Sequence, residues 1–198
     1  MKLIINSLCK KFDKKTVFNN FSHSFPEKGI VAIAGESGIG KTTLLRIIAG
    51  LDKDYCGEVL GGGIGNVSFA FQEYRLFPNL TAFENVIFAI SDGKDEAVCI
   101  NAKKLLMRLG FRENDFTLLP SELSGGMKQR VSLARAFMKK ADILLLDEPT
   151  KELDPTNAKA VKEIITEQSK ERLIIMVSHH GDDISDLNAE VINISKNE

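Results

Sequence analysis

The sequence predicts an α/β fold with a mainly parallel sheet, an antiparallel β edge at the N-terminus and an inserted helical lobe. Short apolar runs of strand length alternate with helical patterns over much of the chain, which favours a parallel sheet flanked by helices. Consecutive helical patterns fill the middle, so we interpret residues 74–140 as a lobe inserted into a core of residues 1–73 and 141–198. The 198 residues are enough for a single domain with a substantial buried core.

The N-terminal third combines β patterns with one helix. Aromatic and histidine side chains alternate with serines over residues 21–25, which is the period of a half-buried strand in an antiparallel sheet. The apolar run Ile30–Ala34 predicts a buried strand. After a Gly-rich turn, Lys41–Ala49 predicts a helix that Gly50 closes. Asn66–Phe71 predicts one more strand.

The middle of the chain is helical. Thr81 and Glu84 have the spacing of a capping box, which opens a helix that we expect to run through Ile90. Residues 96–109 place apolar side chains at helical spacings, and residues 124–138 predict a third helix.

The α/β pattern resumes after the lobe. Ile143–Asp147 predicts a buried strand, and Asp154 followed by proline supplies an N-cap for a helix that ends near Gln168. Leu173–Ser178 and Glu190–Ile194 predict the last two strands.

Composition excludes several classes of protein. Lys and Arg total 26 and Asp and Glu total 27, a net charge of −1, which gives no sign of a chain that coats nucleic acid. Apolar residues make up 43%, which excludes wholesale disorder. Three widely spaced cysteines indicate neither a disulfide framework nor a metal cluster. No run approaches the roughly 18 apolar residues of a membrane span, and the N-terminus lacks the apolar core of a signal peptide, so we expect a cytoplasmic protein.

A phosphate-binding loop follows the strand Ile30–Ala34. Gly35–Thr42 fits the pattern GxxxxGK[ST] and lies between a strand and a helix, as this P-loop requires. Its glycines let backbone N–H groups surround phosphate oxygens at the positive end of the helix. We expect Lys41 near the β and γ phosphates, Thr42 on Mg²⁺ and Thr43 near the α-phosphate. The set expected to bind nucleotide is Gly35, Ser37, Gly38, Gly40, Lys41, Thr42 and Thr43. The alternative is an ordinary Gly-rich turn.

Two acids at the end of a later strand complete a P-loop NTPase core. Asp147 and Glu148 follow four apolar residues, so both lie at the carboxyl edge of the predicted sheet. We expect Asp147 to hold Mg²⁺ and Glu148 to orient and deprotonate the attacking water. Buried strands often end in acids, so these two acids indicate a nucleotide site only together with the phosphate-binding loop.

The segment Ser124–Arg130 has the features of an anion-binding helix start. Ser124 is an N-cap candidate, and Gly125 and Gly126 leave the first N–H groups unobstructed. No acid occurs in the segment, so nothing within it neutralises the helix dipole. The alternative is a helix start weakened by glycine.

Taken together, these motifs resemble the ATP-binding cassette (ABC) family, and the chain looks like the nucleotide-binding subunit of an ABC transporter. Gly35–Thr42 matches Walker A, Leu123–Met127 matches the LSGGQ signature, and Ile143–Glu148 matches Walker B with its catalytic glutamate. The other positions that match are Gln72 of the Q-loop, Leu153–Asp154 of the D-loop, the switch histidine His179 and the adenine-stacking aromatic Phe12.

The resemblance implies a mechanism shared by two chains. In this family two cassettes pack head to tail, and each ATP lies between Walker A of one and the signature of the other. Ser124, Gly125 and Gly126 would then contact the nucleotide bound by a partner, expected to be an identical subunit. His179 would contact the γ-phosphate, and Gln72 would sense metal and water. The other implied partners are membrane permease subunits and a solute-binding protein, with the cassette on the inner face of the membrane and no nucleic acid involved.

This sequence departs from the family pattern at three places. Met127 replaces the usual glutamine, Lys151–Glu152 stand where small residues are commoner, and His180 stands where many members have an acid. None of these removes a group expected to touch phosphate, metal or water, so we expect an active ATPase that uses ATP and Mg²⁺. The stretches 71–78 and 123–131 look like those of importers of the nitrate, sulfonate and taurine class.

The sequence leaves alternatives for the function of the chain and for the location of some residues. One alternative is a soluble ABC ATPase of DNA repair or translation, although the sequence lacks room for their coiled-coil or tandem additions. Another is a GTPase or small-molecule kinase, although neither class explains the signature. Phe12 could lie in the apolar core instead of stacking on adenine. Five basic residues are expected to form a solvated helix face: Lys128, Arg130, Arg135, Lys139 and Lys140.

Overall fold

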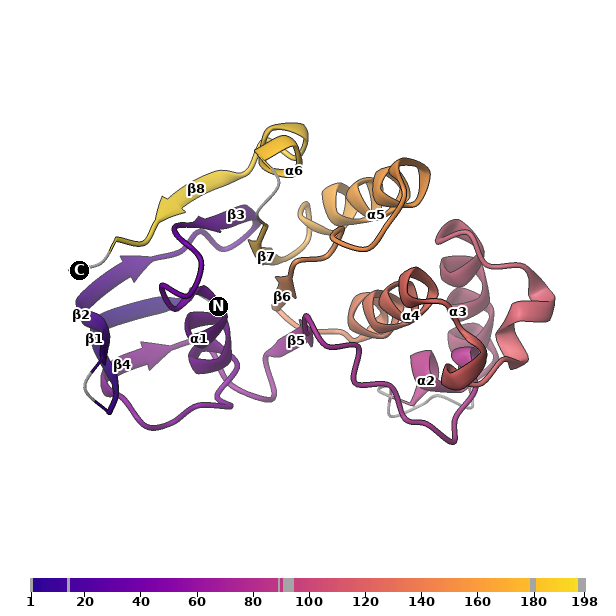
Figure 1. Ribbon diagram of the computed structural model, residues 1–198, viewed down its shortest axis with the longest axis horizontal. Helices are drawn as coiled ribbons and strands as arrows, with labels where there is room; N and C mark the ends of the chain where they lie inside the picture. The colour runs from indigo at the N-terminus through magenta and orange to yellow at the C-terminus, as the bar shows by residue number, and fades with distance from the viewer. Residues whose placement is uncertain (1, 14, 89, 91–94, 179–180, 196–198) are drawn as a thin grey trace.

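A computed structural model describes residues 2–13, 15–88, 90, 95–178 and 181–195. Its centre is a parallel sheet, as predicted, and the five strands have the order β5-β6-β7-β3-β8 (Figure 1). The strands are β3 (Gly29–Ala34), β5 (Val67–Ala70), β6 (Ile143–Asp147), β7 (Leu173–Val177) and β8 (Glu190–Asn193). Each one was expected from its apolar run, and the bounds agree to within one residue.

A three-stranded antiparallel sheet forms the N-terminal edge, with the order β2-β1-β4. Its strands are β1 (Ile4–Phe12), β2 (Lys15–Ser24) and β4 (Cys56–Leu60). The sequence did not indicate β4, whose side chains are mostly exposed. Gly57 of β4 has φ +99°, and a Cβ there would lie 2.5 Å from the carbonyl oxygen of Ser7 on β1. Strand β4 therefore forms through close backbone contact with β1, and no alternation of apolar residues reveals it in the sequence.

Helices cover both faces of the parallel sheet. Alternate residues of β6 face opposite ways: Leu144 and Leu146 pack with α4 and α5, while Ile143 and Leu145 pack with α1 and the antiparallel strands. The helices that flank the sheet are α1 (Lys41–Ile48), α4 (Gly125–Met138) and α5 (Pro155–Gln168). A sixth helix, α6 (Gly181–Asp186), precedes β8 and was not predicted.

The middle of the chain is helical, as expected. Thr81 and Glu84 form the capping box of α2 (Ala82–Ile87), which ends three residues before the expected Ile90. The remaining elements are α3 (Glu96–Arg108) and two 3-10 helices, Glu113–Thr117 and Pro120–Glu122. Figure 1 shows α2, α3 and α4 gathered on the side away from the antiparallel strands. No helix among the described residues is long and apolar enough to cross a membrane.

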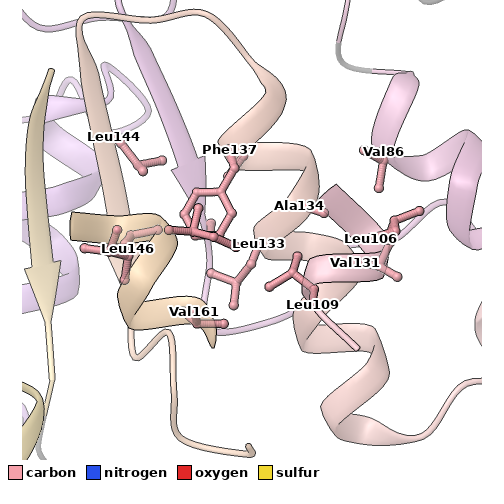
Figure 2. Packing of buried hydrophobic residues seen from close by; sticks show 14 of the residues in the cluster. Val86, Leu106, Leu109, Val131, Leu133, Ala134, Phe137, Leu144, Leu146 and Val161 are labelled. Carbon is pink, nitrogen blue, oxygen red and sulfur yellow. The ribbon is translucent and has the colours of Figure 1, made fainter. Parts of the chain in front are cut away.

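The helical segment shares its apolar core with the parallel sheet. Figure 2 shows Leu106 of α3 and Val131 of α4 in the same cluster as Leu144 and Leu146 of β6. Phe137 and Leu133 of α4 lie between these two groups, beside Val161 of α5. Helix α4 therefore shares one apolar cluster with both α3 and the parallel sheet.

The prediction of a solvated basic face on α4 is wrong for most of its members. Arg130 is buried and donates from Nη1 to the carbonyl oxygen of Leu109 at 2.5 Å and to Asn157 Oδ1 at 3.0 Å. Arg135 donates to the backbone carbonyls of Tyr74 and Arg75 after β5. Lys139 donates to those of Ile64, before β5, and Val67, its first residue. These long side chains reach carbonyls that a charge pattern alone does not reveal.

Candidate functional site

A cavity of about 580 Å³ lies at the carboxyl end of the parallel sheet. The loops after β3, β5 and β6 and the end of β7 all meet there, at the edge where ligands bind in open α/β sheets. Its lining includes the following expected nucleotide-binding and catalytic residues: Phe12, Ser37, Gly38, Gly40, Lys41, Thr42, Thr43, Gln72 and Glu148.

The phosphate-binding loop depends on glycine backbone geometry. Gly38 and Gly40 have φ +71° and +120°, in the region that side chains other than glycine rarely adopt. A Cβ at Gly40 would lie 2.2 Å from Val17 Cγ1, so the loop is packed tightly against β2. Helix α1 begins directly after this glycine, and no acid occurs in its first turn. The loop therefore presents N–H groups and a positive helix end to the cavity.

Lys41 is buried at the base of the loop. Its Nζ donates to the carbonyl oxygens of Gly35 at 2.7 Å and Glu36 at 2.9 Å. Burial lowers the pKa of Lys41, and the carboxylates of Glu148 and Asp147 oppose this shift. The cation is thus held beside the loop and facing the two acids.

Thr42 and Asp147 meet although 105 residues separate them in the chain. The Thr42 hydroxyl donates to Asp147 Oδ2 at 2.9 Å. Hydroxyl and carboxylate oxygens are the donors that Mg²⁺ prefers, and this ion usually takes only one or two protein ligands beside phosphates. No group of three or more His, Cys, Asp or Glu residues that could hold a metal occurs in the described ranges. The donor set fits a Mg²⁺ that arrives with nucleotide.

Glu148 occupies a strained position at the edge of the cavity. Its φ of +55° is in the left-handed region, and its backbone N–H donates to the carbonyl oxygen of Val177 at 2.9 Å. The buried amide of Gln129 donates to the Glu148 carbonyl oxygen at 3.2 Å. Lys151 Nζ lies 3.6 Å from Glu148 Oε2 and also lines the cavity. Sequence reasoning gave neither Gln129 nor Lys151 a place at the site.

Phe12 lies at the mouth of the cavity and is 48% exposed, so its alternative core position is wrong. The buried ammonium group of Lys10 lies 4.6 Å from the centre of its ring. Lys15 also lines the cavity, and its Nζ donates to the carbonyl oxygen of Gly38 at 2.9 Å. The strand β2 thus contributes a cation that the sequence did not single out.

The signature segment lies apart from this cavity. Ser124 caps α4, and its hydroxyl accepts from Met127 N at 3.3 Å, as expected. Ser124, Gly125 and Gly126 do not belong to the cavity lining. A carboxylate does approach this helix start: a Cβ at Gly125 would lie 2.8 Å from Glu152 Oε2, which the Tyr74 hydroxyl also contacts. The first turn of α4 itself holds no acid, as expected, but Glu152 brings a carboxylate to it from elsewhere in the chain.

The predicted switch histidine His179, and His180 beside it, lie outside the described residues. The strand that leads to them, β7, ends at the cavity with Val177. Gln72 follows β5 and lines the cavity with an exposed side chain.

Proteins with similar sequences are named as ATP-binding proteins, in agreement with a nucleotide site in this cavity. An aliphatic sulfonates import ATP-binding protein, SsuB of Bacillus cereus, is 37% identical over 209 residues, covering 98% of this chain and 82% of that protein. Thiamine import ATP-binding protein ThiQ of Rhizobium meliloti is 40% identical over 189 residues, covering 89% and 79%. Sulfate/thiosulfate import ATP-binding protein CysA of Vibrio vulnificus is 40% identical over 181 residues, covering 83% and 51%.

A solved structure shares the fold. It is a dimeric, post-hydrolysis state of the ATP-binding cassette MJ0796 bound to ADP and Pi, with a TM-score of 0.83 and 25% sequence identity. The match covers 98% of this chain and 94% of that one. The family model described as ABC transporter matches residues 18–151, which is more than half of the sequence. The chain therefore belongs to the ABC transporter family.

Proposed function

We propose that the chain is the ATP-hydrolysing subunit of a bacterial ABC importer, and that two copies close on ATP to drive a membrane permease. The observation that carries the proposal is the cavity that Lys41, Thr42 and Glu148 line, with Asp147 hydrogen-bonded to Thr42 although it is not part of the cavity lining. The relatives support the importer class, since SsuB, ThiQ and CysA are all named as import ATP-binding proteins.

The cavity residues divide the chemistry of ATP hydrolysis between them. The loop from Gly35 to Thr43 binds the phosphates through backbone N–H groups, and Lys41 supplies positive charge. Phe12 stacks on adenine with its exposed ring face. Glu148 orients the attacking water and accepts its proton, while Gln72 and His179 contact water and γ-phosphate, as the family resemblance implies.

Thr42, Asp147 and Gln72 are the residues that would hold Mg²⁺. The bound ion would neutralise charge that develops on the phosphate oxygens. The hydroxyl and carboxylate of the first two are already within 2.9 Å of each other, so little rearrangement is needed.

The location of the signature segment explains why we propose that ATP hydrolysis needs two copies of the chain. Ser124, Gly125 and Gly126 present a helix start that does not face this chain's own cavity. In the proposed dimer they contact the ATP held by the partner, as the family resemblance implies. The similar cassette MJ0796, whose structure is dimeric and bound to ADP and Pi, supports an assembly of two chains. We further propose the division into a core of residues 1–73 and 141–198 and a lobe of residues 74–140.

The remaining partners follow from the importer class. We propose permease subunits, a solute-binding protein, a position on the inner face of the membrane and a solute of the nitrate, sulfonate and taurine class. The name of SsuB supports the sulfonate part. No observation favours the alternative of a soluble ATPase in DNA repair or translation.

Glu148→Gln tests the catalytic assignment. The amide keeps the size of the side chain but cannot accept the proton, so hydrolysis should fall by about 10²–10⁴-fold while ATP binding is retained. The variant should also accumulate as an ATP-bound dimer in size-exclusion chromatography. Near-normal turnover would remove Glu148 from the role of base.

Two further variants serve as comparisons. Lys41→Ala should instead weaken nucleotide binding, because the charge beside the phosphates is lost. Glu163→Gln makes the same chemical change at an exposed position of α5 and should leave binding and hydrolysis unchanged.

A further inference from the structure

The buried carboxylate of Asp183 joins segments that lead into the proposed active site. Asp183 lies on α6 and is 4% exposed. Its Oδ2 accepts hydrogen bonds from the hydroxyls of Thr150 and, at 2.9 Å, Ser178. Its Oδ1 forms an ion pair with Lys162 Nζ of α5 at 2.7 Å.

The two hydroxyls belong to chain segments with catalytic neighbours. Thr150 is itself buried and lies two residues after Glu148. Ser178 follows β7 and directly precedes His179 in the sequence. One carboxylate oxygen therefore fixes the spacing between the glutamate segment and the end of β7.

The glutamate segment is held from two sides. Gln129 of α4 donates to the carbonyl oxygens of Glu148 and Pro149 at 3.2 and 3.4 Å. Asp183 holds Thr150 from the opposite end of the same segment. Glu148 has a left-handed backbone, which persists only when its surroundings enforce it.

We propose that Asp183 is a positioning residue for ATP hydrolysis, which acts by holding the Glu148 segment and the end of β7 in register. The inference rests on the proposed function, because it assigns hydrolysis to Glu148. Asp183 is not part of the cavity lining, so it acts through the hydroxyls of Thr150 and Ser178. A purely structural ion pair with Lys162 is the competing interpretation.

Asp183→Leu and Thr150→Val separate the two interpretations by steady-state ATPase assays, because leucine has about the size of aspartate but cannot accept the two hydroxyl bonds. A small misplacement of catalytic groups costs up to about 10²-fold, so we expect kcat to fall about tenfold or more in each variant. KM and the affinity for a non-hydrolysed ATP analogue should stay within about twofold of wild type, because the phosphate-binding loop is not touched. The double variant should lose no more than Asp183→Leu alone, since both changes break the bond between Asp183 and Thr150.

Lys162→Met is the matched control. It removes the ion pair but leaves both hydroxyl bonds, so it should lower the free energy of unfolding and leave kcat within about twofold of wild type. The proposal is overturned if Asp183→Leu and Thr150→Val retain kcat, or if Lys162→Met lowers kcat as much as they do. An inactive wild-type protein would instead overturn the proposed function itself, and Thr150→Val keeps the test available if Asp183→Leu does not fold.

Discussion

A single charged side chain, that of Arg130, connects three segments of this protein. Arg130 of α4 is buried and bonds to Leu109, Gly126 and Asn157. Burial lowers its pKa, and Asp154 and Asp115 oppose the shift. Its guanidinium carbon also lies 5.0 Å from the centre of the Phe111 ring. The residue therefore ties α4 to the end of α3 and to the first turn of α5.

Arg130→Met should destabilise the fold by about 1–3 kcal/mol, because the buried carbonyl oxygen of Leu109 loses a charged donor. Methionine keeps most of the aliphatic volume, so little of the loss comes from packing. Urea denaturation followed by circular dichroism measures the change. Lys140→Met, at an exposed position just after α4, should be within about 0.5 kcal/mol of wild type. Equal stability of the two variants would mean that the Arg130 bonds add nothing.

At the scale of elements, the ion pairs between α5 and α6 give the fold a defined pH dependence. Lys162 lies 2.7 Å from Asp183 and 2.8 Å from Asp186. Burial alone would raise the pKa of Asp183, but bonds from Lys162, Thr150 and Ser178 lower it below 3.8. Burial alone would lower the pKa of Lys162, but the two aspartates raise it above 10.5.

The sign of each shift sets the window of stabilisation. The lowered carboxyl pKa stabilises the fold above pH 3.8, and this contribution is lost as the pH falls through the folded-state pKa. The raised ammonium pKa stabilises the fold below pH 10.5, and this contribution is lost as the pH rises through its folded-state pKa. The difference in unfolding free energy between wild type and Lys162→Met should therefore be largest between these values and shrink on both sides. A difference that stays constant from about pH 3 to about pH 7 would contradict this.

The elements that the sequence predicted well are those with a local signal. Strands β6 and β7 are almost wholly apolar because both of their faces are buried. The caps at Thr81, Ser124 and Asp154 mark helix starts by residue type. Strand β4 and helix α6 carry no such signal. The formation of both elements depends on tertiary contacts with other segments of the chain.

At the scale of the whole molecule, the motifs predicted which groups meet but not what holds them. Lys41, Thr42, Asp147 and Glu148 were expected in one place because parallel strands bring their carboxyl ends to one edge. Gln129 could not be predicted, because its bond to Glu148 depends on how α4 packs against the sheet. Nor could the approach of Glu152 to the start of α4, since a complete strand, β6, separates the two in the sequence.

A contact with the permease, which we predict at residues 74–79, also belongs to the scale of the whole molecule. The segment Tyr74–Asn79 runs between β5 and α2, and Phe77 is 42% exposed with its ring 4.4 Å from that of Phe88. Arg75 lies over the ring of Phe71 at 4.0 Å and is exposed to solvent. An exposed aromatic pair beside a cation suits a contact with another protein.

Arg75→Glu and Phe77→Arg should abolish or strongly reduce solute uptake and leave basal ATPase activity unchanged, because neither residue lines the cavity. Transport into proteoliposomes and ATPase rates of the isolated subunit measure the two effects. Met107→Arg places a charge at another exposed apolar position, on α3, and should not affect uptake. Full uptake by both test variants would exclude this segment as the docking site.

The continuous apolar cluster through α4 limits how the molecule can move. Phe137 and Leu133 contact the sheet side of the cluster, while Val131 and Ala134 of the same helix face Leu106 (Figure 2). Pulling the lobe away from the sheet would expose this layer to water at a cost of about 25 cal/mol for each Å² uncovered. Motions that accompany the ATP cycle should therefore be small tilts that preserve side-chain packing, and heating should melt both parts together.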